Sequence, residues 1–177
     1  MRAGYANANY RLETSAGLFL VRHCIHQGRS EVEFELNVLD WLRASGFPAP
    51  VAFRFTGGDR WIEGPDGSHV VLLEWLHGSE PLPNLTNVAV VARALGELHC
   101  LPPPWERWWH RENPGGLKAA SRLKATVGPG APELFRVFAS ELEQLQDHLC
   151  EDLPRGFIHG DLFPSNTLFD DDQLVAF

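Results

Sequence analysis

The stretch His159-Gly160-Asp161-Leu162-Phe163-Pro164-Ser165-Asn166 decides the interpretation of this sequence. Short runs of apolar residues flank it, which predicts a loop between two short strands, the first at residues 157–159. Phosphoryl transfer needs a carboxylate that accepts the proton of an attacking hydroxyl, and it needs oxygen ligands for Mg²⁺. Asp161 can serve as the base and Asn166 as the metal ligand. On spacing alone, Asn166 suits an ordinary turn cap equally well.

The chain beyond this loop forms a predicted hairpin. Residues 167–169 and 174–177 are apolar, and they flank an acidic turn at residues 170–172. The chain stops inside the second strand, and a domain seldom ends on a buried strand without polar residues after it. We therefore expect that the sequence is truncated at its C-terminus.

The first half reads as strands around one helix. Residues 10–14 and 17–22 favour a hairpin, with Ser15-Ala16 in its turn. A helix is predicted from Ser30, where Ser30 and Glu33 have the spacing of a capping box, to Gly46, which can adopt the left-handed conformation that ends a helix.

Three further strands are predicted at residues 50–56, 60–63 and 69–76. After Gly78 the apolar spacing becomes helical, with one stripe from Val88 to Leu98 and another from Leu134 to Leu149. We therefore expect an α+β chain with two lobes, residues 1–78 and residues 79–177.

Composition excludes several classes of protein. The chain has 177 residues, with 15 Lys and Arg against 23 Asp and Glu, and a net charge of −8. This balance argues against a nucleic-acid partner, because few Lys and Arg side chains are available to displace the counterions of nucleic-acid phosphates. The apolar runs are too short to span a membrane, and the three cysteines form no disulfide or zinc pattern. We expect a cytoplasmic protein with no membrane partner, and the sequence does not indicate its oligomeric state.

The pattern H-G-D-x-x-x-x-N at His159, Gly160, Asp161 and Asn166 resembles the catalytic loop of the aminoglycoside phosphotransferase and homoserine kinase-like family. The resemblance extends over nearly the whole chain. Gly46-Phe47-Pro48-Ala49-Pro50 is similar to the family's G-x-P-x-P, and residues 95–99 are similar to its L-G-x-L-H helix. Asparagine-rich stretches at residues 7–10 and 113–116 favour the homoserine-kinase-like branch.

The resemblance implies a protein-kinase-like fold with an antiparallel-sheet N-lobe and a mostly helical, incomplete C-lobe. It also implies ATP-dependent phosphorylation of a small-molecule hydroxyl with Mg²⁺. Asp161 would be the catalytic base and His159 would orient the loop. Asn166 would bind the metal, and Asn7 and Asn9 would lie in the turn that covers the nucleotide. Arg22, paired with Glu35, would bind the phosphates. The backbone from Glu74 to Leu76 would bind adenine.

Departures from the family pattern keep alternatives open. Arg22 stands where protein kinases have lysine, and the family's second metal-binding aspartate would follow Phe177. The chain could therefore be a nucleotide-binding, kinase-like fragment that transfers nothing. Gly160, in place of the arginine of protein kinases, disfavours a protein kinase. A metal-hydrolase site at His159 and Asp161 is disfavoured because no other cluster has ligand spacing.

Overall fold

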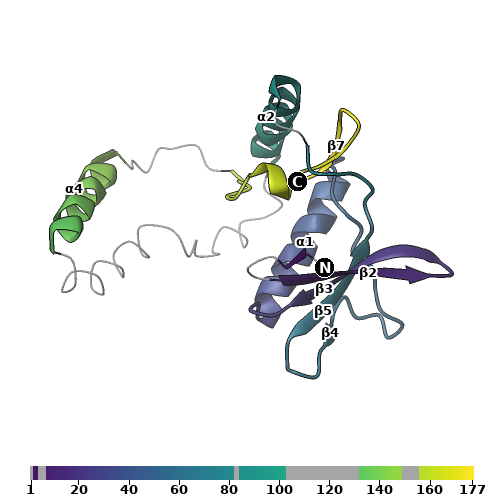
Figure 1. Cartoon of the computed structure of the whole chain (residues 1–177). Helices are drawn as coiled ribbons and strands as arrows, with labels where there is room; N and C mark the ends of the chain where they lie inside the picture. Colours follow the sequence, from purple (N-terminus) through teal and green to yellow (C-terminus); the bar gives the residue numbers. More distant parts are fainter. Residues whose placement is uncertain (1, 4–6, 82–83, 103–131, 149–155) are drawn as a thin grey trace. The chain divides into compact units, whose positions relative to one another are not determined.

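A computed structural model covers the chain, and the residues described here are 2–3, 7–81, 84–102, 132–148 and 156–177 (Figure 1). They belong to two compact units. One unit combines Met1–Leu101 with Phe157–Phe177, and the other is Pro102–Gly156. The boundaries of these units do not coincide with the lobe boundary predicted after Gly78. The two lobes, residues 1–78 and 79–177, therefore stay a prediction.

The first unit contains an antiparallel sheet of five strands in the order β1-β2-β3-β5-β4 (Figure 1). The two longest strands form the predicted hairpin, in which Thr14 pairs with Gly17 across the turn. Gly17 has φ of +129°, which favours glycine at this turn. The strands are β1 (Arg2–Ala3), β2 (Asn7–Thr14), β3 (Gly17–Cys24), β4 (Ile62–Glu63) and β5 (His69–Glu74).

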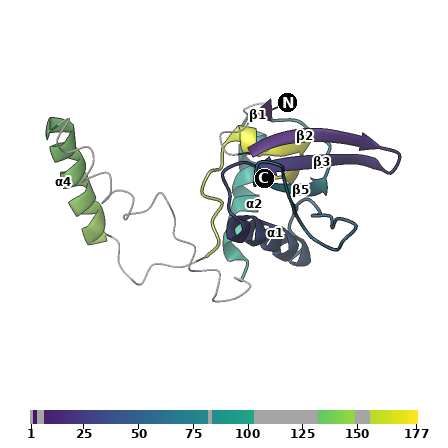
Figure 2. The same ribbon diagram turned by 90° about the horizontal axis from the view of Figure 1, so that it is seen from below.

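Helix α1 (Arg29–Ala44) lies across one face of this sheet (Figure 2). The predicted start was wrong, because the N-cap is Gly28 and the carboxylate of Glu31 accepts its backbone N–H at 2.8 Å. The predicted end is confirmed. Gly46 has φ of +74°, and the Phe47 N–H reaches back to the Leu42 carbonyl at 2.8 Å, which satisfies the last turn.

The core lies between α1 and the sheet. Its five buried residues come from three elements: Cys24 from β3, Val32 and Leu36 from α1, and Val71 and Leu73 from β5. Alternation along β3 places Leu20, Arg22 and Cys24 on the face toward α1. Arg22 is therefore on the face of β3 that is turned toward the helix.

Residues 50–56 do not form the predicted strand. This segment follows β5 through only a few hydrogen bonds, from Phe53 N to Leu72 O and from Glu74 N to Val51 O, both 2.8 Å. Pro50 has no N–H for a ladder, and a turn at residues 55–58 ends the pairing. The predicted strand at residues 157–159 is likewise absent, since these residues have no regular structure.

Among the residues that the structure describes, two further α-helices and a second sheet follow β5. Helix α2 (Leu85–Cys100) contacts β7 (Gln173–Ala176), which pairs with β6 (Leu168–Asp170) as the predicted hairpin. A 3-10 turn, η2 (Pro164–Asn166), precedes β6. The predicted helix in the second unit is α4 (Pro132–His148).

Within the part of the chain that the structure describes, no helix combines the length and apolar character needed to cross a membrane.

Candidate active site

The loop that carries Asp161 has a specific backbone shape. Gly160 has φ of +80°, a conformation that glycine adopts without strain. The turn η2 then begins at Pro164, whose fixed φ suits a first helical position. The Asn166 N–H donates to Phe163 O at 2.9 Å, and the Thr167 hydroxyl donates to Pro164 O at 2.7 Å. These bonds hold residues 163–167 in one tight turn.

This turn brings Asp161 and Asn166 into contact. Asn166 Nδ2 donates to Asp161 O at 2.7 Å and to Asp161 Oδ2 at 3.0 Å. The amide nitrogen faces Asp161, and within the described residues the Asn166 Oδ1 atom has no hydrogen-bond donor. Both side chains are exposed, so a ligand can reach them.

His159 is held beside Asp161. The backbone N–H of Asp161 donates to His159 Nδ1 at 3.3 Å, and the imidazole meets the edge of the Phe177 ring at a centroid distance of 5.4 Å. Burial lowers the pKa of His159, and the Asp161 carboxylate partly opposes this. The hydrogen bond at Nδ1 ties the His159 ring to the backbone at Asp161.

The lowered pKa of His159 predicts a pH dependence of stability. Below its ordinary pKa of about 6.5, the unfolded chain takes up a proton more readily than the folded one. The contribution of neutral His159 is therefore present above about pH 6.5 and is lost as the pH falls below it. We expect His159→Gln to narrow the difference in unfolding free energy between pH 7.5 and pH 5.5, measured by urea titration. An unchanged difference in the variant would contradict this assignment.

The predicted adenine segment begins at the end of β5. The Glu74 N–H is engaged by Val51 O, and the Glu74 carboxylate accepts the Val51 N–H at 3.0 Å and lies 3.6 Å from Arg43 Nη1. The side chain of Glu74 is therefore a structural anchor. Leu76 lies beyond the end of the strand, so its backbone is outside the sheet ladder.

The structure does not bring Arg22 and Glu35 together as an ion pair. Arg22 Nε donates to Asn9 Oδ1 at 3.2 Å, which follows from their direct pairing across β2 and β3. The Glu35 carboxylate accepts a hydrogen bond from Gln27 Nε2. Sequence reasoning missed Gln27, because no local pattern links a loop residue to a helix residue eight positions later.

Asn7 lies at the start of β2, opposite Cys24. Its Oδ1 atom is buried and has no hydrogen-bond donor among the described residues. Asn7 and Asn9 are two residues apart on one strand, so they share the face that carries Arg22. The sheet thus places three predicted nucleotide contacts on one surface.

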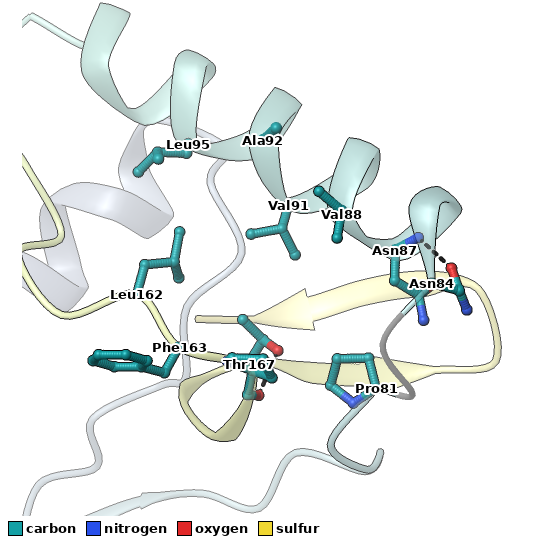
Figure 3. Close-up of a pocket in the computed structure, with 11 residues that line it drawn as sticks. Pro81, Asn84, Asn87, Val88, Val91, Ala92, Leu95, Leu162, Phe163 and Thr167 are labelled. Atoms are coloured by element: carbon teal, nitrogen blue, oxygen red, sulfur yellow. Dashed lines mark hydrogen bonds between the residues drawn. The ribbon is translucent and has the colours of Figure 1, made fainter.

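An apolar hollow of about 310 Å³ lies between α2 and the loop after Asp161 (Figure 3). Its helix side is formed by Val88, Val91 and Leu95, and its loop side by Leu162 and Phe163. Asn84 caps the helix at one end by accepting the Asn87 N–H at 2.8 Å. The hollow adjoins the loop, but Asp161 and Asn166 are not among its lining residues.

A Ser-His-Asp cluster lies on the other face of the sheet. His23 contacts Ser68, and Ser68 contacts Asp66. Both Ser68 Oγ and Asp66 approach the same atom, His23 Nε2. In a nucleophilic triad the acid binds the other ring nitrogen, so this cluster lacks that arrangement.

All 177 residues match the model of the phosphotransferase enzyme family, and the chain belongs to that family. It is similar to homoserine kinase from Methylocella silvestris, with 32% identity over 97% of this chain and 54% of the relative. It is also similar to homoserine kinase from Zymomonas mobilis, with 28% identity over 97% of this chain and 55% of the relative. The chain thus spans about half the length of these relatives.

Solved structures confirm the fold class. The aminoglycoside phosphotransferase from Alicyclobacillus acidocaldarius matches 99% of this chain and 60% of its own, with a TM-score of 0.66 and 18% identity. Spectinomycin phosphotransferase, solved with ADP and spectinomycin, matches with a TM-score of 0.66 and 12% identity, over 100% of this chain and 61% of its own. The chain has the α+β, protein-kinase-like fold with an antiparallel N-terminal sheet.

Proposed function

We propose that the protein to which this chain belongs is an ATP-dependent kinase that phosphorylates a hydroxyl of a small molecule. The observation that carries the proposal is the contact between Asp161 and Asn166 on the loop at His159. It joins a solvent-accessible carboxylate to an amide whose oxygen accepts no hydrogen bond from the residues that the structure describes. The family of the chain supports the same class of reaction.

In this proposal Asp161 accepts the proton of the acceptor hydroxyl. The hydroxyl oxygen forms a bond to the γ-phosphorus of ATP while the bond between that phosphorus and the β,γ-bridging oxygen breaks, so ADP leaves with its electron pair. His159 fixes the Asp161 main chain through Nδ1. Because His159 Nδ1 already accepts the Asp161 N–H, the Asp161 carboxylate is the group proposed as the proton acceptor.

The donor atoms at this loop fit Mg²⁺. The Asn166 amide oxygen is a hard oxygen ligand of the kind that this ion prefers, and Asn166 lies beside the Asp161 carboxylate. In the part of the chain that the structure describes, no three or more His, Cys, Asp or Glu side chains are arranged to hold a metal ion. Mg²⁺ is commonly bound by one or two carboxylates together with substrate phosphates. When bound, Mg²⁺ would neutralise charge on those phosphates.

The nucleotide would lie against the α1 face of the sheet. Arg22 supplies a cation for the phosphates, with Asn7 and Asn9 beside it on β2 and Glu35 nearby on α1. The Glu74 N–H is already engaged, so adenine would use the Glu74 carbonyl and the backbone of Leu76.

The acceptor class follows from the relatives. Homoserine and aminoglycosides share a hydroxyl and an amine, and proteins that resemble this chain are named for these compounds. We therefore propose an amino alcohol as the substrate. A cytoplasmic setting and the absence of nucleic-acid and membrane partners stay predictions.

Measurement of ADP release tests this function. We expect ADP formation above background with MgATP and at least one amino alcohol from a panel of homoserine, choline, spectinomycin and aminoglycosides. Glycerol serves as a hydroxyl control without an amine. ATP binding without transfer to any acceptor would indicate a nucleotide-binding protein that transfers nothing. Radiolabel in an added protein would indicate a protein kinase.

A further inference from the structure

Arg22 and Glu35, which were expected to form an ion pair, each form a hydrogen bond with a side-chain amide instead. Asn9 accepts from Arg22, and Gln27 donates to Glu35. Both charges act on the same buried thiol: burial raises the pKa of Cys24, Arg22 lowers it and Glu35 raises it. The two charges are therefore close to one point of the core, although they are not paired with each other.

Gln27 is anchored at the start of α1. His69 Nδ1 donates to the Gln27 carbonyl oxygen at 3.2 Å, and the His69 ring packs edge-on against Trp61 at a centroid distance of 4.6 Å. The next residue, Gly28, caps the helix. The main chain of Gln27 is thus tied to both β5 and α1, which fixes the origin of its side chain.

The orientation of the Gln27 amide leaves an acceptor unused. Its Nε2 atom faces Glu35, and its Oε1 atom is buried with no hydrogen-bond donor among the described residues. A buried carbonyl oxygen that accepts no hydrogen bond is unfavourable, so a donor that moves close to Gln27 Oε1 would stabilise it. A guanidinium has five N–H groups, and the hydrogen bonds of Arg22 within the described part use only Nε.

We propose that Gln27 is a positioning residue for the nucleotide site. An amide offers a donor on one side and an acceptor on the other, so it can link an anion to a cation. Gln27 Nε2 holds Glu35, and Gln27 Oε1 receives an N–H of Arg22 when phosphates draw the guanidinium away from Asn9. The inference rests on the proposed function and deepens it.

A double-mutant cycle between Gln27 and Glu35 tests this role. The dissociation constant of MgATP is measured by calorimetry for wild type, Gln27→Ala, Glu35→Ala and the double variant. We expect Gln27→Ala to weaken MgATP binding by about fivefold to tenfold, since one hydrogen bond to a charged group is lost. In the Glu35→Ala background the same change should weaken binding clearly less than in wild type, because the link that Gln27 makes from Glu35 to Arg22 is already broken at Glu35.

Two further variants separate hydrogen bonding from packing. Gln27→Met keeps the length of the side chain but has no donor, so it should weaken binding as much as Gln27→Ala while the melting temperature stays near wild type. Gln173→Ala, at an exposed residue of β7, is the matched control and should bind as wild type.

Each outcome is decisive. Additive effects in the cycle, or wild-type binding by Gln27→Met, overturn the role of Gln27 and leave the proposed function standing. Absence of MgATP binding by wild type overturns both.

Discussion

Asp161→Asn is expected to lower the rate of phosphoryl transfer by about 10²- to 10⁴-fold, the usual contribution of a general base. The amide has the shape of the carboxylate, and its oxygen can still accept the Asn166 Nδ2 hydrogen bond seen at 3.0 Å. It cannot take a proton from a hydroxyl. The dissociation constant of MgATP should therefore change much less than the turnover number.

The same substitution in the neighbouring hairpin is a matched control. Asp171 is exposed and has φ of +50°, a conformation in which asparagine is well tolerated. Asp171→Asn should leave turnover and stability near wild type. Transfer at the wild-type rate by Asp161→Asn would remove the assignment of the base, whichever acceptor is used.

Local patterns were sufficient to predict the elements that have local causes. The β2–β3 hairpin follows from two apolar runs joined by Ser15-Ala16. The end of α1 follows from Gly46, which adopts the left-handed conformation. The β6–β7 hairpin follows from the acidic turn at residues 170–172. Each of these features lies within one short, continuous stretch of the chain.

Elements were harder to predict where several neighbouring residues compete for the same hydrogen bond, or where pairing depends on a distant strand. Ser30 and Glu33 have the spacing of a capping box, yet Glu31 caps Gly28 while Glu33 pairs with Arg29 at 2.8 Å. Three glutamates in two helical turns offer competing caps, and their sequence does not rank them. Residues 50–56 have strand composition, but only a few of their backbone groups find partners on β5.

The candidate site shows the same division. Contact between Asp161 and Asn166 was predictable because both lie on one short loop. The partners of Arg22 and Glu35 were not, because hydrogen bonds across a sheet or from a loop to a helix depend on side-chain orientation. Asn9 and Gln27 are polar residues that could equally have faced solvent.

The second large effect is expected from substitution of Gly78, which should lower the free energy of unfolding. Gly78 follows β5 with φ of +147°, and its backbone passes very close to β6. A Cβ atom there would lie 2.6 Å from Phe169 O and 2.9 Å from Leu168 Cγ. The next residue, Ser79, exchanges backbone hydrogen bonds of 2.8 and 2.9 Å with Phe169, so the two segments cannot separate freely. The closest atom is a backbone oxygen, which cannot rotate away.

Gly78→Ala should therefore lower the free energy of unfolding by about 2 to 4 kcal/mol, from overpacking and backbone strain together. Urea titration followed by circular dichroism measures this change. Gly96→Ala provides the opposite case, because Gly96 lies inside α2 and a Cβ atom would meet nothing within 4 Å. That variant should gain about 0.5 to 1 kcal/mol from the higher helix propensity of alanine. If the two variants had equal stability, the close approach of residue 78 to β6 would be wrong, and so would the backbone path that joins the N-terminal sheet to the hairpin after Asp161.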